Sequence, residues 1–97
     1  MTQPAFQLAD APGALAVSGA LTFATAAAAL EAGRAQIDRL KPATLDLAGV
    51  TQADSAGLAT VLALLAHARQ AGGVLKVANA PRGLEALARV SGVDTLL

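Results

Sequence analysis

The 97-residue chain carries seven basic and seven acidic side chains, and 55% of its residues are hydrophobic although only 2% are aromatic. This length suffices for one domain and not for two, and the balanced charge excludes the basic surface that binds nucleic acid. The chain has no cysteine, which excludes disulfides and thiolate metal ligands and fits a reducing compartment. No apolar run is long enough to cross a bilayer, and the N-terminus lacks a signal-peptide pattern. We therefore expect a cytoplasmic protein without direct membrane insertion.

The low charge content of 14% has two interpretations. It leaves apolar surface exposed, which is typical of a protein that binds a partner. An alanine-rich composition alone would have the same effect.

The first forty residues predict a hairpin followed by a helix. Phe6–Leu8 and Leu15–Ser18 are short apolar stretches, and Asp10–Gly13 between them has turn chemistry. The alanine-rich segment Phe23–Leu40 then shows helical spacing of its apolar residues, and Thr22 is placed to cap its start.

A buried strand and the strongest helix come next. Pro42 ends the first helix, and Ala43–Leu47 is a short β-prone run. Ser55–Ala71 has helical periodicity and is ended by two glycines. The residues expected on the core face of this helix are Leu58, Val61, Leu62, Leu65, Ala68 and Arg69.

The remaining chain predicts a strand and a helix, with room for one more strand. Val74–Val77 is apolar, Asn79 and Pro81 signal a helix start, and Val93–Leu97 has the composition of a last short strand. The order of elements predicts an α/β fold, with a mixed four- to five-stranded sheet and three or more helices packed against it.

The segment between the strand and the strongest helix is the candidate site, because α/β folds place function beyond the carboxyl ends of their strands. Asp54 or Ser55 is expected to cap the helix. The Ser55 hydroxyl is flanked by the small residues Ala53, Ala56 and Gly57, so another protein can approach it closely. A phosphate on Ser55 would instead act as a wedge at such an interface, because it adds about two negative charges.

Catalysis by Ser55 is not expected. The nucleophile motif of serine hydrolases has glycine two positions before the serine, where this chain has Ala53. The single histidine, His67, lies twelve residues further along the same helix, roughly 18 Å away. The chain also lacks a phosphate-binding glycine loop with lysine and a cluster with metal-ligand spacing. We therefore expect no catalytic residue, no cofactor and no metal.

The face of the strongest helix opposite its expected core face is a candidate contact patch. It carries Thr60, Ala63, Leu64 and His67, and an exposed leucine among small residues suits a protein contact. Alternatively, Leu64 is half buried under a neighbouring helix. A lone histidine is most simply a surface residue.

Asp54-Ser55-Ala56-Gly57-Leu58, preceded by Leu45-Asp46-Leu47 and followed by an amphipathic helix, resembles the signature of STAS domains, the sulfate-transporter and anti-sigma-antagonist domains. The resemblance covers nearly the whole chain and implies a single STAS domain over residues 1–97 with the STAS-type fold. In bacterial anti-sigma factor antagonists of this family, a serine kinase phosphorylates the serine that matches Ser55. This relationship makes Ser55 a candidate for phosphorylation and the anti-sigma factor kinase a candidate partner.

The stretch Gly19-Ala20-Leu21-Thr22-Phe23 is more similar to the single-domain, MlaB-like STAS subunit of the Mla phospholipid-transport ABC complex, because antagonists usually carry an acidic residue where this chain has Thr22. The similarity implies a non-catalytic cytoplasmic subunit, peripheral to the inner membrane, that binds the ATPase subunit and supports outer-membrane lipid asymmetry. The expected partner-binding residues are Asp54, Ser55, Ala56, Gly57, Thr60, Leu64 and His67.

Overall fold

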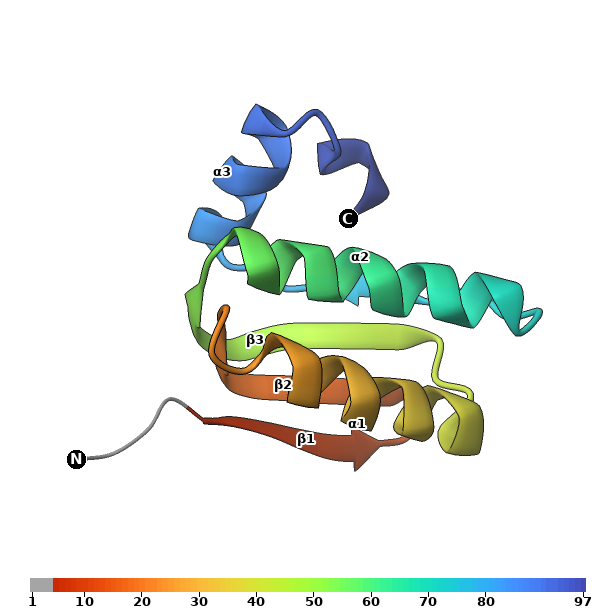
Figure 1. Cartoon of the computed structure of the whole chain (residues 1–97). Helices are drawn as coiled ribbons and strands as arrows, with labels where there is room; N and C mark the ends of the chain where they lie inside the picture. The colour runs from red at the N-terminus through yellow and green to blue at the C-terminus, as the bar shows by residue number, and fades with distance from the viewer. Residues whose placement is uncertain (1–4) are drawn as a thin grey trace.

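The structure is a computed structural model that describes residues 5–97 (Figure 1). Its elements are β1 (Phe6–Ala11), β2 (Ala14–Leu21), α1 (Ala26–Leu40), β3 (Thr44–Ala53), α2 (Ser55–Gln70), β4 (Lys76–Ala78), α3 (Arg82–Val90) and a short 3-10 helix, η1 (Asp94–Leu96). The strands form one sheet in the order β1-β2-β3-β4. The β1–β2 pair is antiparallel, and the other two pairs are parallel. The predicted α/β class and mixed sheet are confirmed.

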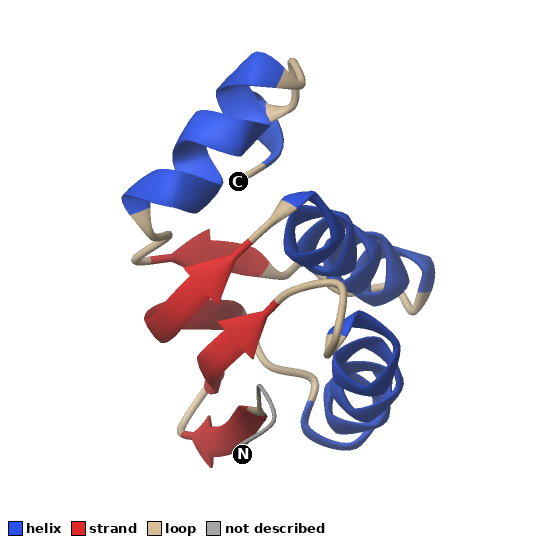
Figure 2. Ribbon diagram, turned by 60° about the vertical axis from the view of Figure 1, so that its left-hand side comes forward, coloured by secondary structure: helices blue, strands red, loops and turns tan. Residues whose placement is uncertain are grey.

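The two longer helices, α1 and α2, lie side by side on one face of the sheet (Figure 2). Alternate residues of β2 and β3 point toward them and are buried, while the residues between these, such as Ala16 and Asp46, remain partly exposed. The fully buried leucines and valine at the centre of this core are Leu15, Leu21, Leu45, Leu47, Val61 and Leu84. The third helix, α3, and η1 lie beyond α2, on the side away from α1 (Figure 1).

Close packing of α1 on α2 depends on a glycine. A Cβ at Gly33 of α1 would lie 2.7 Å from a methyl group of Leu64 on α2. Because Gly33 has no side chain, Leu64 packs over the backbone of α1 and only 3% of its surface is exposed. The contact fixes the spacing of the two helices.

The α1 helix begins later than its composition predicts, at Ala26 instead of Phe23. Thr22 is not its cap. The preceding turn is organised by Thr25, whose hydroxyl accepts a hydrogen bond from Thr22 N at 3.0 Å and donates one to Ala20 O at 2.8 Å. Phe23 therefore lies in the turn between β2 and α1.

Two strand predictions are corrected at their boundaries. The third strand extends to Ala53, well past the predicted Ala43–Leu47, because its second half also pairs with β2. The fourth begins at Lys76, and Val74 lies in the preceding loop with 70% of its surface exposed.

The predicted strand over Val93–Leu97 is wrong, because this segment folds back beside α3. Gly92 takes a φ of +75°, and Val93 N donates a hydrogen bond to Ala88 O at 2.8 Å. A left-handed glycine with this pairing is the usual ending of a helix and reverses the chain. The reversed chain then forms η1.

The buried face of α2 is rotated toward α1 relative to the prediction. Thr60 and Leu64, expected to be exposed, are buried. Leu62 and Leu65, expected in the core, are only partly buried, and Arg69 is exposed. The predicted core face follows from packing on the sheet, whereas α1 covers a second side of α2, in line with the alternative that Leu64 lies under a neighbouring helix.

Replacing Leu64 by alanine should therefore lower the free energy of unfolding by about 2–5 kcal/mol, because it empties a fully buried site between the two helices. Leu62→Ala should cost less, about 1–2 kcal/mol, because part of that side chain is already in water. Urea denaturation of both variants measures the difference. A larger loss for Leu62→Ala would contradict this packing.

Candidate functional site

The candidate site lies where β2 and β3 end and α2 begins. Ser55 is the first residue of α2 and is exposed, as predicted. The cap is Asp54, which has extended backbone angles, and its Oδ1 accepts a hydrogen bond from Gly57 N at 3.0 Å. The Ser55 hydroxyl therefore stands at the start of the helix next to an ionised cap.

The second carboxylate oxygen of Asp54 reaches a different part of the chain. Oδ2 accepts a hydrogen bond from Phe23 N at 3.0 Å, across 31 residues of sequence. These backbone hydrogen bonds, foremost the one from Phe23 and then the one from Gly57, hold the pKa of Asp54 below its ordinary value. One carboxylate thus connects the β2–α1 turn to the first turn of α2.

Gly57 allows the first turn of α2 to lie directly against the end of β2. A Cβ at this position would overlap the carbonyl oxygen of Leu21. The same carbonyl oxygen accepts a hydrogen bond from Asp54 N at 3.3 Å. The position of Ser55 is therefore set by contacts between two backbones.

A hollow with an apolar lining runs from this turn between the two helices. Phe23 lies at its end, and 85% of its surface is exposed. The other lining residues are Ala26, Ala27 and Leu30 of α1, and Ala56, Ala59, Thr60 and Ala63 of α2. We call this set, with Phe23, the apolar hollow. Phe23 was not among the predicted site residues, because its segment was assigned to a helix.

The predicted partner-binding residues do not all share one surface. Asp54, Ser55 and Ala56 lie together, but Gly57 is buried behind them. Thr60 lines the hollow but is almost fully buried, and its hydroxyl donates to Ala56 O at 2.9 Å.

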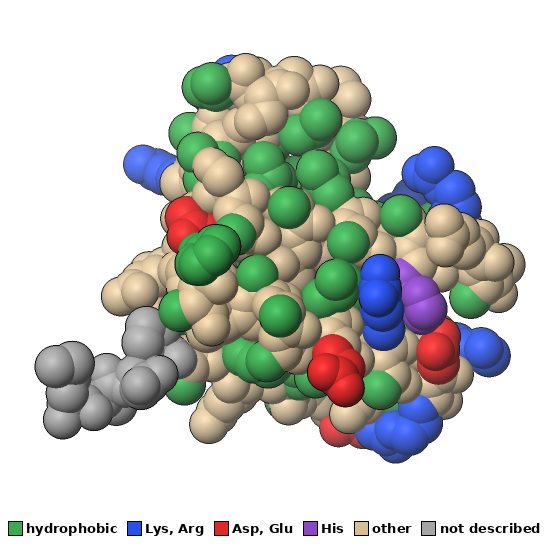
Figure 3. All heavy atoms as spheres, in the orientation of Figure 1, with side chains coloured by type: hydrophobic (Ala, Val, Ile, Leu, Met, Phe, Trp, Pro, Cys, Tyr) green, Lys and Arg blue, Asp and Glu red, His purple; other side chains and the backbone are tan. Residues whose placement is uncertain are grey.

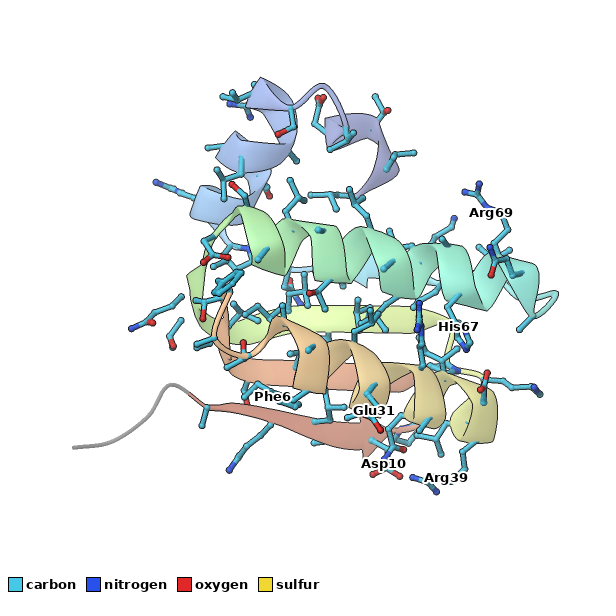
Figure 4. All side chains as sticks on the ribbon, viewed as in Figure 1. Phe6, Asp10, Glu31, Arg39, His67 and Arg69 are labelled. Atoms are coloured by element: carbon cyan, nitrogen blue, oxygen red, sulfur yellow. The ribbon has the colours of Figure 1, made fainter. Side chains whose placement is uncertain are left out.

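Leu64 and His67 lie outside this cluster. Of the two expectations for Leu64, an exposed contact or burial under a neighbouring helix, the first is wrong and the second is confirmed, because α1 covers this side chain. His67 lies toward the other end of α2 (Figure 4), and its Nε2 is 2.7 Å from Asp38 Oδ1 on α1. The histidine thus joins the two helices far from Ser55.

Apart from Asp54, the charged side chains on one face of the molecule gather away from the candidate site. On the face shown in Figure 3, most of them lie at the C-terminal ends of α1 and α2, and hydrophobic side chains predominate elsewhere. Residues 5–97 contain no group of three His, Cys, Asp or Glu side chains that could hold a metal ion. No helix in this same range has both the length and the apolarity needed to span a membrane.

Comparison with known proteins identifies the fold. A family model described as "Mlab, STAS domain" matches residues 5–97. The match covers every strand and helix described above, including the turn at Ser55. No curated protein matches the chain significantly.

Replacing Gly57 by alanine should destabilise the protein by several kcal/mol, because the new methyl group meets a backbone carbonyl that cannot move aside. Gly83→Ala is the matched control on α3, where a Cβ meets nothing within 4 Å. That change should be neutral or stabilise the helix by up to about 1 kcal/mol. Thermal unfolding of both variants tests the contact, and equal melting temperatures would contradict it.

Proposed function

The chain belongs to the STAS domain family, and we propose that it is a non-catalytic accessory subunit of a phospholipid-transport ABC transporter of the Mla type. In this role it binds the ATPase subunit and supports its activity in maintaining outer-membrane lipid asymmetry. The protein is cytoplasmic and peripheral to the inner membrane through this complex. The observation that carries the proposal is the exposed Ser55 at the start of α2, next to the apolar hollow.

The chemistry around Ser55 supports a binding role. STAS domains are typically binding modules without enzymatic activity. Ser55 is separated from His67 by three turns of helix, and that histidine interacts with Asp38. Among residues 5–97, no histidine therefore lies near the hydroxyl. Both oxygens of the neighbouring Asp54 carboxylate accept backbone hydrogen bonds, so this carboxylate is engaged rather than free to serve as the base that a nucleophilic serine needs.

The shape of the surface suits close contact with another protein. Ser55 and Ala56 present small side chains, and Ala59 and Ala63 continue this pattern along the hollow. Small side chains let a partner backbone approach, and an apolar centre is typical of protein interfaces. The ATPase would thus contact α2 from its first turn onward.

A second candidate function is that of an anti-sigma factor antagonist, in which a serine kinase phosphorylates Ser55. The exposure of this hydroxyl at the first position of α2 favours the idea, because helix N-termini tolerate phosphate. The ionised carboxylate of Asp54, with its lowered pKa, opposes it, since it already occupies the Gly57 amide and would repel the phosphate.

Replacing Ser55 by glutamate or arginine should weaken pull-down of the cognate ATPase at least a hundredfold and lower its ATP hydrolysis. An interface charge without a partner costs several kcal/mol, and each 1.4 kcal/mol is about tenfold in affinity. Ser55→Thr keeps a small hydroxyl and should be tolerated. The isolated variants should remain folded, because Ser55 is exposed.

Arg89→Ala on α3 is the control and should change neither binding nor hydrolysis, because Arg89 is exposed away from the hollow. If Ser55→Glu binds and stimulates the ATPase as well as wild type, the docking surface is elsewhere. Transfer of phosphate to Ser55 by an anti-sigma factor kinase would instead establish the second function.

A further inference from the structure

We infer that Phe23 is the anchor residue of the docking surface and that Asp54 is the positioning residue that holds Phe23 in place. This inference rests on the proposed function, because the anchor is assigned to the interface with the ATPase. To the proposed function it adds two roles: the Phe23 ring supplies binding energy, and the Asp54 carboxylate orients Phe23.

The exposure of Phe23 is the first argument. The chain has only two aromatic residues, and Phe6 packs partly against the core. The other, Phe23, has 85% of its surface in water. A phenyl ring buries a large apolar area when a partner covers it, and a few such side chains usually carry most of the energy of an interface.

The rigidity of the turn is the second argument. Phe23 N is held by Asp54 Oδ2 at 3.0 Å. On either side of it, Thr22 N donates to Thr25 Oγ1, and Thr25 N donates to Thr22 O, each at 3.0 Å. An exposed aromatic residue on a fixed backbone loses less conformational freedom on binding than one on a mobile loop. The turn is thus preorganised for contact.

The choice of aspartate at position 54 is the third argument. Capping α2 requires one oxygen, and serine or asparagine serves that purpose about as well. The second oxygen of Asp54 is what links α2 to Phe23. The same carboxylate therefore fixes Phe23 relative to Ser55.

The kind of partner follows from the surface. Phe23 projects at the end of a hollow formed by alanines, a leucine and one threonine, none of which carries a charge. We assign it to an apolar pocket on the ATPase subunit that takes one phenyl ring, with an apolar ridge that fills the hollow beside it.

The binding experiment compares Phe23→Ala with Val90→Ala against the purified ATPase. Both side chains are almost fully exposed, at 85% and 88%, so neither substitution should change the melting temperature much. Phe23→Ala should weaken binding at least about tenfold. Val90→Ala, on α3, should leave the affinity within about twofold of wild type.

The positioning role is tested with Asp54→Asn. The asparagine oxygen can still cap Gly57, but its amide group would place a donor against Phe23 N. Binding should weaken several-fold. The double variant of Asp54→Asn with Phe23→Ala should bind no worse than Phe23→Ala alone, because a residue that acts only through Phe23 adds nothing once the ring is gone.

A titration by NMR tests the link without the partner. Because hydrogen bonds lower the pKa of Asp54 in the folded state, the link stabilises the fold above the ordinary aspartate pKa of about 3.9. That stabilisation is lost as the pH falls through the lower folded value. The amide resonances of Phe23 and Gly57 should shift together with one midpoint below about 3.9. In Asp54→Asn this shared transition should disappear.

The results distinguish a failure of the proposed function from a failure of the anchor role of Phe23. If wild type binds no ATPase, the proposed function fails and the anchor role falls with it. If wild type binds and Ser55→Glu does not, but Phe23→Ala binds as wild type does, only the anchor role is overturned. A Phe23 amide that does not titrate with Gly57, or additive losses in the double variant, would overturn the positioning role of Asp54.

Discussion

The contact between the first turn of α2 and the end of β2 is the constraint on which the candidate site depends. Gly57 lies against the carbonyl of Leu21, and that carbonyl also accepts the amide of Asp54. No side chain separates the helix from the strand here, so neither can shift without the other. The exposed Ser55 is positioned by this backbone contact, two residues before Gly57. The backbone that presents the Ser55 hydroxyl is thus fixed by contacts of the protein interior.

Close packing at small residues also occurs further along the two helices. Gly33 lets Leu64 lie on the backbone of α1, which sets the distance between α1 and α2. The alanines that precede Gly33 on α1 and Leu64 on α2 then line the apolar hollow. The low aromatic content and high alanine content of the chain therefore have a structural purpose, because larger side chains would fill the hollow and separate the helices. The same packing that stabilises the fold shapes the surface proposed to bind the ATPase.

Local sequence signals predicted most of the fold but only part of the site. Helix spacing and glycine placed α2 correctly, and the exposed Ser55 at its start was expected. The burial of Leu64 could not be read from the periodicity of α2, because it depends on Gly33 of another helix. Phe23 was assigned to a helix from the alanine-rich spacing of its segment, whereas it lies in a turn that Thr25 organises locally and that Asp54, 31 residues away, holds through Phe23 N. The contacts that set the burial of Leu64 and hold Phe23 against α2 thus join residues far apart in the sequence.

The proposed contact surface carries little charge beyond the Asp54 carboxylate, and this has a consequence for the kinetics of association. On the face shown in Figure 3, most charged side chains lie toward the C-terminal ends of α1 and α2, and the residues that line the apolar hollow carry no charge. Long-range attraction between charges accelerates encounter and is weakened by salt. With the Asp54 carboxylate as the one charged group placed at this surface, the complex should form close to the unsteered rate of about 10⁵–10⁶ M⁻¹s⁻¹. Ionic strength should hardly change this rate, so the affinity would be set by how slowly the partners separate.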